Sequence, residues 1–402
     1  MRSIAAVSLA AGLLACAGCD SSSSAGTPAA GAPVANEPSA ADCDKIAQVP
    51  PPAGKPPVAL VVDNTASQIG HPLPDGLLKK LGDAQHAGQP LVIVAVDGQS
   101  PSVVRTAALD PSPDKDSKAG DNARAEALRC VNRWAHATES LPKHQGSDVL
   151  EALNAASRQH PSAVYVVSDG LGNTGAFNID AVGFDAEPQE LATSLREANA
   201  LAPTLNNLQI TWYELGESAK PLPQAARTSL QNLWQATLKS VGTTVTFDLA
   251  TGGRVAAPSG LPADDVSIPE AATVTSACGT RITVPAALLF HPGSAELQPD
   301  AADVLKGVAG TLNGHPDWSA KITGHTADYG TADSRKQLSV QRAGAVRDFL
   351  AGAGIDRSRL AADGVGATQP AVPEIVGGRH DLAAAARNRR VVIEIGPGGC
   401  GS

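Results

Sequence analysis

Between residues 58 and 247, short apolar runs rich in β-branched residues alternate with longer segments of helical spacing. Continuous β-branched character is typical of strands that are buried on both faces. Such strands, separated by helices, predict an α/β domain with a mostly parallel, doubly wound sheet. The predicted strands are Val58–Val62, Leu91–Val96, Ala163–Val167, Leu208–Tyr213 and Thr243–Phe247, and the predicted helices are Asn122–Ala137, Ser147–Arg158 and Gln224–Val241. Function in such sheets gathers beyond the carboxyl ends of the strands.

The last third of the chain carries a different order of elements. Its predicted strands are Arg281–Val284, Ala320–His325, Arg359–Gly366 and Val391–Ile395, and its predicted helices are Pro299–Leu312 and Ser339–Ala353. This β-α-β-α-β-β order predicts an α+β domain. A length of 402 residues agrees with two or three domains.

The amino terminus predicts export. A charged start at residues 1–3 precedes an apolar run, Ile4–Ala15, which is too short to span a bilayer. The small residues and cysteines that follow are similar to a bacterial lipoprotein signal, which implies that residues 1–18 are removed and that Cys19 carries the lipid, including palmitate. Lipidation of Cys16, or an ordinary secretory signal without lipid, is the alternative.

Cysteine number supports this choice. The chain has six cysteines, and removal of Cys16 with lipidation of Cys19 leaves four, an even number suited to disulfides outside the cytosol. Four cysteines allow three pairings. We expect Cys43–Cys130 and Cys278–Cys400, because each pair brackets one predicted domain.

Composition separates the folded segments from their connections. Residues 19–42 are rich in Ser, Gly, Pro and Ala and predict a flexible tether. Residues 251–276 predict a linker between an α/β domain at 43–250 and an α+β domain at 277–398. The formal net charge is −9, without a basic tail or stripe, which argues against nucleic-acid binding.

Three polar segments follow or connect the strands of the first domain. Asp63-Asn64-Thr65-Ala66-Ser67 follows the first strand, Gly146–Leu150 opens a helix, and Ser168-Asp169-Gly170 follows the third strand. Together they resemble a von Willebrand factor A domain, which implies binding of a protein partner through a metal site. The resemblance places one Mg²⁺, with Mn²⁺ or Ca²⁺ as alternatives, among Asp63, Thr65, Ser67, Ser147 and Asp169. Oxygen ligands suit these cations. The alternative is that the aspartates begin turns and that Ser147 or Asp148 only caps a helix.

Four segments of the second domain carry another resemblance. Gly324–Gly330, Leu338–Ala343, Asp363–Gly366 and Arg387–Ile395 resemble, in this order, the OmpA-like domain that binds peptidoglycan. The family uses an Asp and an Arg to grip diaminopimelate of the peptide stem. A carboxylate suits the ammonium of this ligand, and a guanidinium suits its carboxylate.

The binding residues are only partly matched. Arg342 matches the family's Arg, whereas the family's Asp falls on Ala327, with a carboxylate one residue later. The resemblance implies a peptidoglycan site formed by Thr326, Asp328, Arg342, Asn388 and Arg390.

These patterns predict a lipid-anchored protein of the bacterial cell envelope, outside the cytoplasm. It would bind peptidoglycan non-covalently through its second domain and an envelope protein through its first. The alternative, favoured by Ala327, is an adhesion or assembly scaffold that has lost peptidoglycan binding. We expect no enzyme, because no Ser-His-Asp, Cys-His or His-x-x-x-His arrangement is visible.

Overall fold

The computed structural model describes residues 38–66, 72–112, 114, 116–248, 260–262, 264–267, 270–376 and 379–397. The predicted signal peptide, the lipidation site at Cys19 and nearly all of the tether lie outside these residues, as do Ser67 and Cys400. In the described part, no helix combines the length and the apolar character needed to cross a bilayer.

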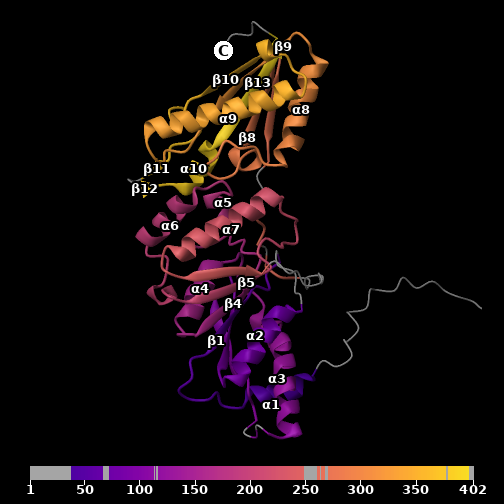
Figure 1. Cartoon of the computed structure of the whole chain (residues 1–402), viewed down its shortest axis with the longest axis vertical. Helices are drawn as coiled ribbons and strands as arrows, with labels where there is room; N and C mark the ends of the chain where they lie inside the picture. Colours follow the sequence, from indigo (N-terminus) through magenta and orange to yellow (C-terminus); the bar gives the residue numbers. More distant parts are fainter. Residues whose placement is uncertain are drawn as a thin grey trace, which may run out of the picture. The chain divides into compact units, whose positions relative to one another are not determined.

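The first domain contains a six-stranded sheet in the order β3-β2-β1-β4-β5-β6. Figure 1 labels three of these strands, β1, β4 and β5. Its strands are β1 (Val58–Val62), β2 (Pro90–Ala95), β3 (Ser102–Ala108), β4 (Ala163–Val167), β5 (Gln209–Tyr213) and β6 (Thr244–Asp248). All neighbouring pairs are parallel except β2 and β3, which are antiparallel. The predicted mostly parallel sheet is confirmed, and the antiparallel edge strand β3 is an addition to it.

Helices cover both faces of this sheet because side chains of a strand alternate in direction. On β1, Leu60 packs in one apolar core with Leu77 and Trp134, whereas Val61 packs in the other with Leu153. The first core takes α1 (Ala40–Ala47), α2 (Asp75–His86) and α3 (Lys118–Ala135), and the second takes α4 (Val149–Ser157), α5 (Ile179–Val182), α6 (Pro188–Glu197) and α7 (Gln224–Lys239).

A disulfide fastens the first helix of this domain. The predicted Cys43–Cys130 bond is present and joins α1 to α3, with the Cα atoms 5.4 Å apart. Both cysteines are buried. Cys278 is exposed, and its predicted partner lies outside the described residues.

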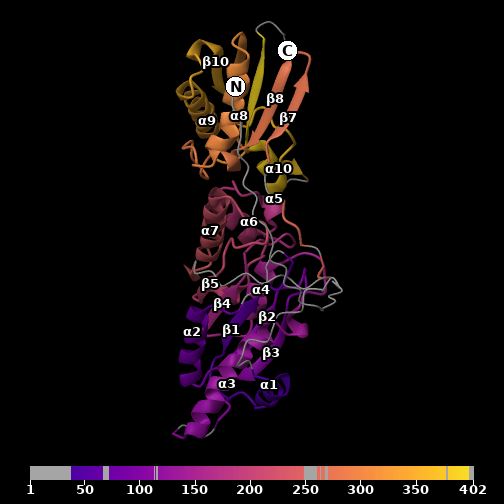
Figure 2. The ribbon, with the colours of Figure 1, turned by 90° about the vertical axis from the view of Figure 1, so that its right-hand side faces the viewer.

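The second domain has a five-stranded sheet in the order β10-β9-β13-β8-β7. Its strands are β7 (Ala272–Ser276), β8 (Gly279–Pro285), β9 (Trp318–Gly324), β10 (Leu360–Gly364) and β13 (Arg390–Pro397). Strands β9 and β10 are parallel, and β13 runs antiparallel to both β8 and β9. The predicted α+β order is therefore present. Figure 2 shows the additional strand β7 beside β8, although residues 272–276 fall in the predicted linker.

Two long helices cover one face of this sheet. Helices α8 (Ala301–Gly314) and α9 (Ala332–Gly352) share a core with β8, β9 and β13. The remaining elements are the short hairpin of β11 (Ile375–Val376) and β12 (Arg379–His380), helix α10 (Leu382–Asn388), and 3-10 turns at Thr138–Ser140, Pro203–Leu205, Ala286–Leu288 and Arg357–Arg359.

Candidate functional site

Helix α9 places Arg342 beneath the loop that follows β9. The side chain is 3% exposed, its Nε donates to the carbonyl of Ser294 at 2.9 Å, and its guanidinium lies 5.2 Å from the ring centre of Phe290. Burial lowers the pKa of Arg342 to about 10, so the group stays protonated at neutral pH. No described residue forms a hydrogen bond with its terminal nitrogens. Arg342 is thus a buried cation with unused donors.

These donors line a cavity of about 510 Å³. Besides Arg342, its walls include Thr326 and Tyr329 after β9, and Asp185, Glu187 and Glu190 from the first domain. Thr326 is buried, and its hydroxyl has no hydrogen-bond partner among the residues that the structure describes. A cation and a hydroxyl therefore lie on one side of the cavity, and carboxylates contributed by the other domain complete its wall.

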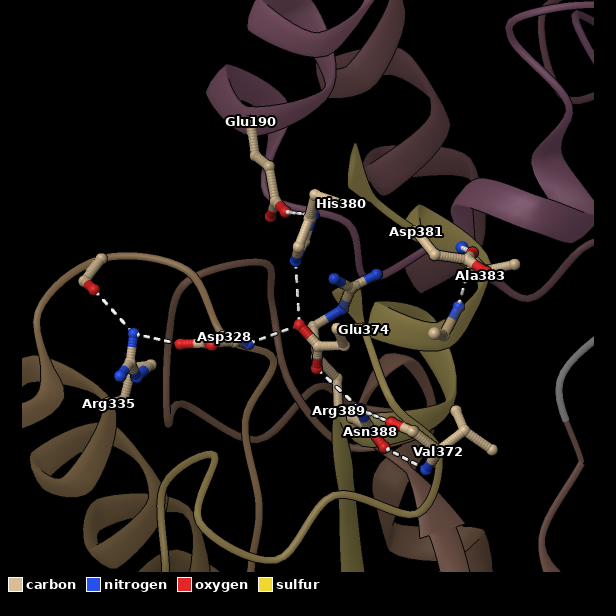
Figure 3. Close-up of polar contacts among 12 residues, drawn as sticks. Glu190, Asp328, Arg335, Val372, Glu374, His380, Asp381, Ala383, Asn388 and Arg389 are labelled. Atoms are coloured by element: carbon tan, nitrogen blue, oxygen red, sulfur yellow. Dashed lines mark hydrogen bonds and ion pairs between the residues drawn. The ribbon is translucent and has the colours of Figure 1, made fainter. Parts of the chain in front are cut away.

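The carboxylate of Asp328 is engaged elsewhere. Its Oδ1 lies 2.6 Å from Nη1 of Arg335, and its backbone N–H donates to Oε2 of Glu374 at 2.7 Å (Figure 3). Asp328 does not line the cavity, whereas Ala327 and Arg335 do. The structure therefore does not direct the shifted carboxylate toward Arg342.

Asn388 is buried and forms hydrogen bonds with the neighbouring loop, residues 371–374. Its Oδ1 accepts from the backbone N–H groups of Ala371 and Val372, at 2.6 and 3.1 Å. Its Nδ2 donates to the carbonyl of Val372 and to Oε1 of Glu374, at 2.8 and 2.7 Å. Asn388 is fully buried, and these four hydrogen bonds hold the loop.

Glu374 extends this network toward the first domain. Its Oε2 lies 2.9 Å from Nε2 of His380, and Nδ1 of the same ring lies 3.0 Å from Oε1 of Glu190 on α6 (Figure 3). Burial raises the pKa of Glu190, and the nearby Arg389 and His380 oppose this rise. The imidazole therefore bridges two buried carboxylates that come from different domains.

Arg389 and Arg390 point to opposite sides, as adjacent residues at the start of a strand do. Arg389 lines the cavity with Arg342; its Nε lies 3.1 Å from Oδ2 of Asp185, and its Nη2 donates to the carbonyl of Val182. Arg390 lines a separate cavity of about 580 Å³ on the other face of the sheet. Of the predicted binding residues, Thr326 and Arg342 share the cavity, Asp328 and Asn388 support its surroundings, and Arg390 lies apart.

The separate cavity also contains His325. Burial and the nearby Arg390 lower the pKa of this imidazole to about 4, so it is neutral at physiological pH. Its Nδ1 lies 3.2 Å from the carbonyl of Gln369. The arrangement indicates a packed, neutral histidine.

The predicted metal ligands lie at the carboxyl ends of β1 and β4. Thr65 Oγ1 donates to Oδ1 of Asp63 at 2.6 Å, and Ser168 Oγ donates to Oδ2 at 2.7 Å. Asp169 follows Ser168 and accepts from the N–H of Leu171. Asp63 and Asp169 are buried.

Asp264, a residue that the motif did not indicate, also reaches this group. Ser147 Oγ donates to Oδ2 of Asp264 at 3.1 Å. Burial, with a contribution from Asp264, raises the pKa of Asp63 to about 6. Asp148 accepts from the N–H of Glu151 at 2.9 Å and caps α4, the role that the alternative interpretation assigned to this position.

The donor set fits a hard cation in its chemistry. The buried carboxylates of Asp63 and Asp264, the second of which contributes to the raised pKa of the first, supply oxygen ligands of the kind that Mg²⁺ prefers. The hydroxyls of Thr65 and Ser147 lie beside them. Within the described ranges, no group of three or more His, Cys, Asp or Glu residues is arranged to hold a metal. Hydroxyl ligands would therefore have to complete the coordination.

Comparisons with known proteins concern the second domain. A family model described as the OmpA family matches residues 289–379. The peptidoglycan-associated lipoprotein of Mesorhizobium japonicum is 30% identical over 129 residues, which are 32% of this chain and 74% of that protein. The chain belongs to the OmpA family. The membership rests on its C-terminal α+β domain.

Two further similarities concern the same OmpA-family domain. Probable lipoprotein YiaD of Escherichia coli (strain K12) is 33% identical over 116 residues, 29% of this chain and 51% of that protein. The crystal structure of the peptidoglycan-associated lipoprotein from Burkholderia pseudomallei is 29% identical, with a TM-score of 0.25, and the match covers 27% of this chain and 87% of that one. The chain thus spans about half the length of YiaD. Thr326 and Arg342 lie inside the segment matched to the OmpA family, whereas Asn388 and Arg389 lie beyond it.

Proposed function

We propose that this protein is a lipid-anchored component of the bacterial cell envelope that binds peptidoglycan non-covalently through its OmpA-family domain. The observation that carries this proposal is the cavity at Arg342, where the terminal donors of a buried guanidinium form no hydrogen bond with any residue that the structure describes. Leaving such a cation without a partner is costly, so the site is suited to a ligand carboxylate. The name of the Mesorhizobium japonicum relative, peptidoglycan-associated lipoprotein, supports the choice of ligand.

Co-sedimentation of the full mature chain with purified sacculi tests this proposal. Arg342→Met keeps an apolar side chain over Phe290 but removes the charge-assisted contact, so we expect binding to weaken at least about thirtyfold. Arg347→Met on the same helix is the matched control, because Arg347 pairs with the exposed Asp348. Failure of the unmutated chain to sediment would favour the scaffold alternative, and release of soluble muropeptides would show a hydrolase.

The first domain supports a second part of the proposal, the binding of an envelope protein. Its strand order, β3-β2-β1-β4-β5-β6, and its polar residues at the carboxyl ends of β1 and β4 agree with the resemblance to a von Willebrand factor A domain. The proposed ligands of a divalent cation are Asp63, Thr65, Ser67, Ser147 and Asp169, and the carboxylate of Asp264 lies beside Ser147. An open position on such a cation accepts a partner's carboxylate.

Calorimetric titration with Mg²⁺, Mn²⁺ and Ca²⁺ tests the metal. We expect heat of binding from the unmutated chain and none from Asp63→Ala. Absence of heat with all three ions would remove the metal from the proposal. Mass spectrometry of the mature amino terminus tests the anchor, which requires a lipidated Cys19.

A further inference from the structure

The OmpA-family domain has a cation at its cavity, but none of its described residues brings an uncommitted carboxylate to that cavity. Ala327 lacks a charge, and Asp328 is paired with Arg335. Glu374 accepts from Asn388 and from the backbone of Asp328, and it also faces His380. A zwitterionic ligand held by Arg342 would therefore find no uncommitted carboxylate for its ammonium group among the described residues of this domain's wall of the cavity.

The first domain brings three carboxylates to the same cavity, two on the segment that leads into α6 and one in the first turn of that helix. Asp185 is paired with Arg389, and Glu190 is paired with His380. Glu187 lines the cavity as well, and no described residue forms an ion pair or a side-chain hydrogen bond with it. It precedes α6 but does not cap that helix with its side chain. Glu187 is thus the carboxylate with capacity to accept a ligand.

The position of Glu187 is well defined by its neighbours. A Cβ atom added to Gly293 would come within 2.9 Å of Glu187 Oε2, which shows that the carboxylate lies against the loop beside Ser294. Ser294 in turn accepts from Arg342. On either side of Glu187, the pairs Asp185–Arg389 and Glu190–His380 fasten the segment to the OmpA-family domain.

We propose that Glu187 supplies, from the first domain, the acidic half of the binding site, and that it accepts the ammonium group of the ligand whose carboxylate Arg342 binds. This inference rests on the proposed peptidoglycan binding. The ligand class is an amino-acid centre that carries a free ammonium and a free carboxylate, such as the unlinked end of diaminopimelate in a peptide stem. The two domains then form one site, and neither domain alone contains both charged halves.

Calorimetry on the full chain tests the inference with two soluble probes. The first is a muropeptide whose stem ends in diaminopimelate, and the second is the same molecule with the free amine of that residue acetylated. We expect the unmutated chain to prefer the first probe by about tenfold or more, the range for a hydrogen bond to a charged group. Glu187→Gln should weaken binding of the first probe by a similar factor and should reduce the preference to less than about threefold.

Two variants serve as controls. Glu197→Gln removes the same charge from an exposed position on α6 and should leave both affinities unchanged. Asp328→Asn should also leave the preference between the probes in place, because its carboxylate is committed to Arg335.

The outcomes separate the two proposals. No binding of either probe by the unmutated chain refutes both peptidoglycan binding and the role of Glu187. Binding that is lost in Arg342→Met but unchanged in Glu187→Gln refutes only the inference. Tighter binding by Glu187→Gln also refutes it, since the carboxylate would then obstruct the cavity.

Discussion

Asp63 should destabilise the metal-free protein as the pH rises, and Asp63→Asn tests this directly. Burial raises the pKa of this carboxyl to about 6 from an ordinary value of 3.8, so the folded state binds its proton more tightly than the unfolded state. The stabilising contribution of Asp63 to the free energy of unfolding is therefore fully present below about pH 4, and it is lost as the pH rises through about 6. This rise of about two units in the pKa of Asp63 corresponds to about 3 kcal/mol in the free energy of unfolding.

Asparagine resembles the protonated acid. Its amide oxygen can accept the hydrogen bond from the Thr65 hydroxyl, and its NH₂ group can donate to the Ser168 hydroxyl. We therefore expect Asp63→Asn to match the unmutated protein at pH 4 and to exceed its free energy of unfolding by about 3 kcal/mol at pH 8. The assay is urea denaturation with a chelator at several pH values. Asp83→Asn, at an exposed position on α2, is the control and should show no such divergence.

Saturating Mg²⁺ should reverse the order at pH 8, since a cation favours the ionised carboxylate that only the unmutated protein has. A difference between the two proteins that stays constant from pH 4 to pH 8 would refute the reasoning about burial. A pH-dependent difference that Mg²⁺ leaves unchanged would refute only the metal.

Two further predictions concern stability. Replacing both Cys43 and Cys130 by Ala should lower the free energy of unfolding of the first domain by up to about 4.6 kcal/mol, because the disulfide closes a loop whose ends are 87 residues apart and so reduces the chain entropy of the unfolded state. Urea denaturation measures this free energy, and a loss below about 1 kcal/mol would contradict the prediction. Asn388→Ala removes four hydrogen bonds and should lower the free energy of unfolding of the OmpA-family domain by about 2–4 kcal/mol. Thermal denaturation measures this loss, and an unchanged midpoint temperature would show that other contacts hold the loop.

The continuous apolar strands made the parallel sheet predictable, because β1, β2 and β4 are buried on both faces and their sequences record this. Strand β3 was missed because it lies at an edge, where exposed and buried residues do not alternate regularly. Strand β7 was missed because every residue in it is exposed. In both cases pairing with a neighbouring strand decides the structure, and local sequence carries little of that information.

The residues of the candidate cavity could be predicted from the sequence only where they belong to a recognisable motif. Arg342 and Thr326 belong to such a motif, and the structure places both at one cavity. Glu187 and Asp264 belong to none, since long-range packing brings them to their sites. Arg389 could have been identified from the alternation of side chains at the start of β13, which leaves one of the two adjacent arginines on each face.

The bond between Cys43 and Cys130 also determines how the protein would bear mechanical load. If the amino-terminal segment is an anchor and the OmpA-family domain holds the cell wall, tension enters the folded chain just before α1 (Ala40–Ala47). Without the disulfide, that short helix would be the first element to peel away. With it, the pull passes covalently from α1 into the interior of the 18-residue helix α3, which lies on the sheet. The load is then shared by the whole first domain rather than carried by its terminal helix.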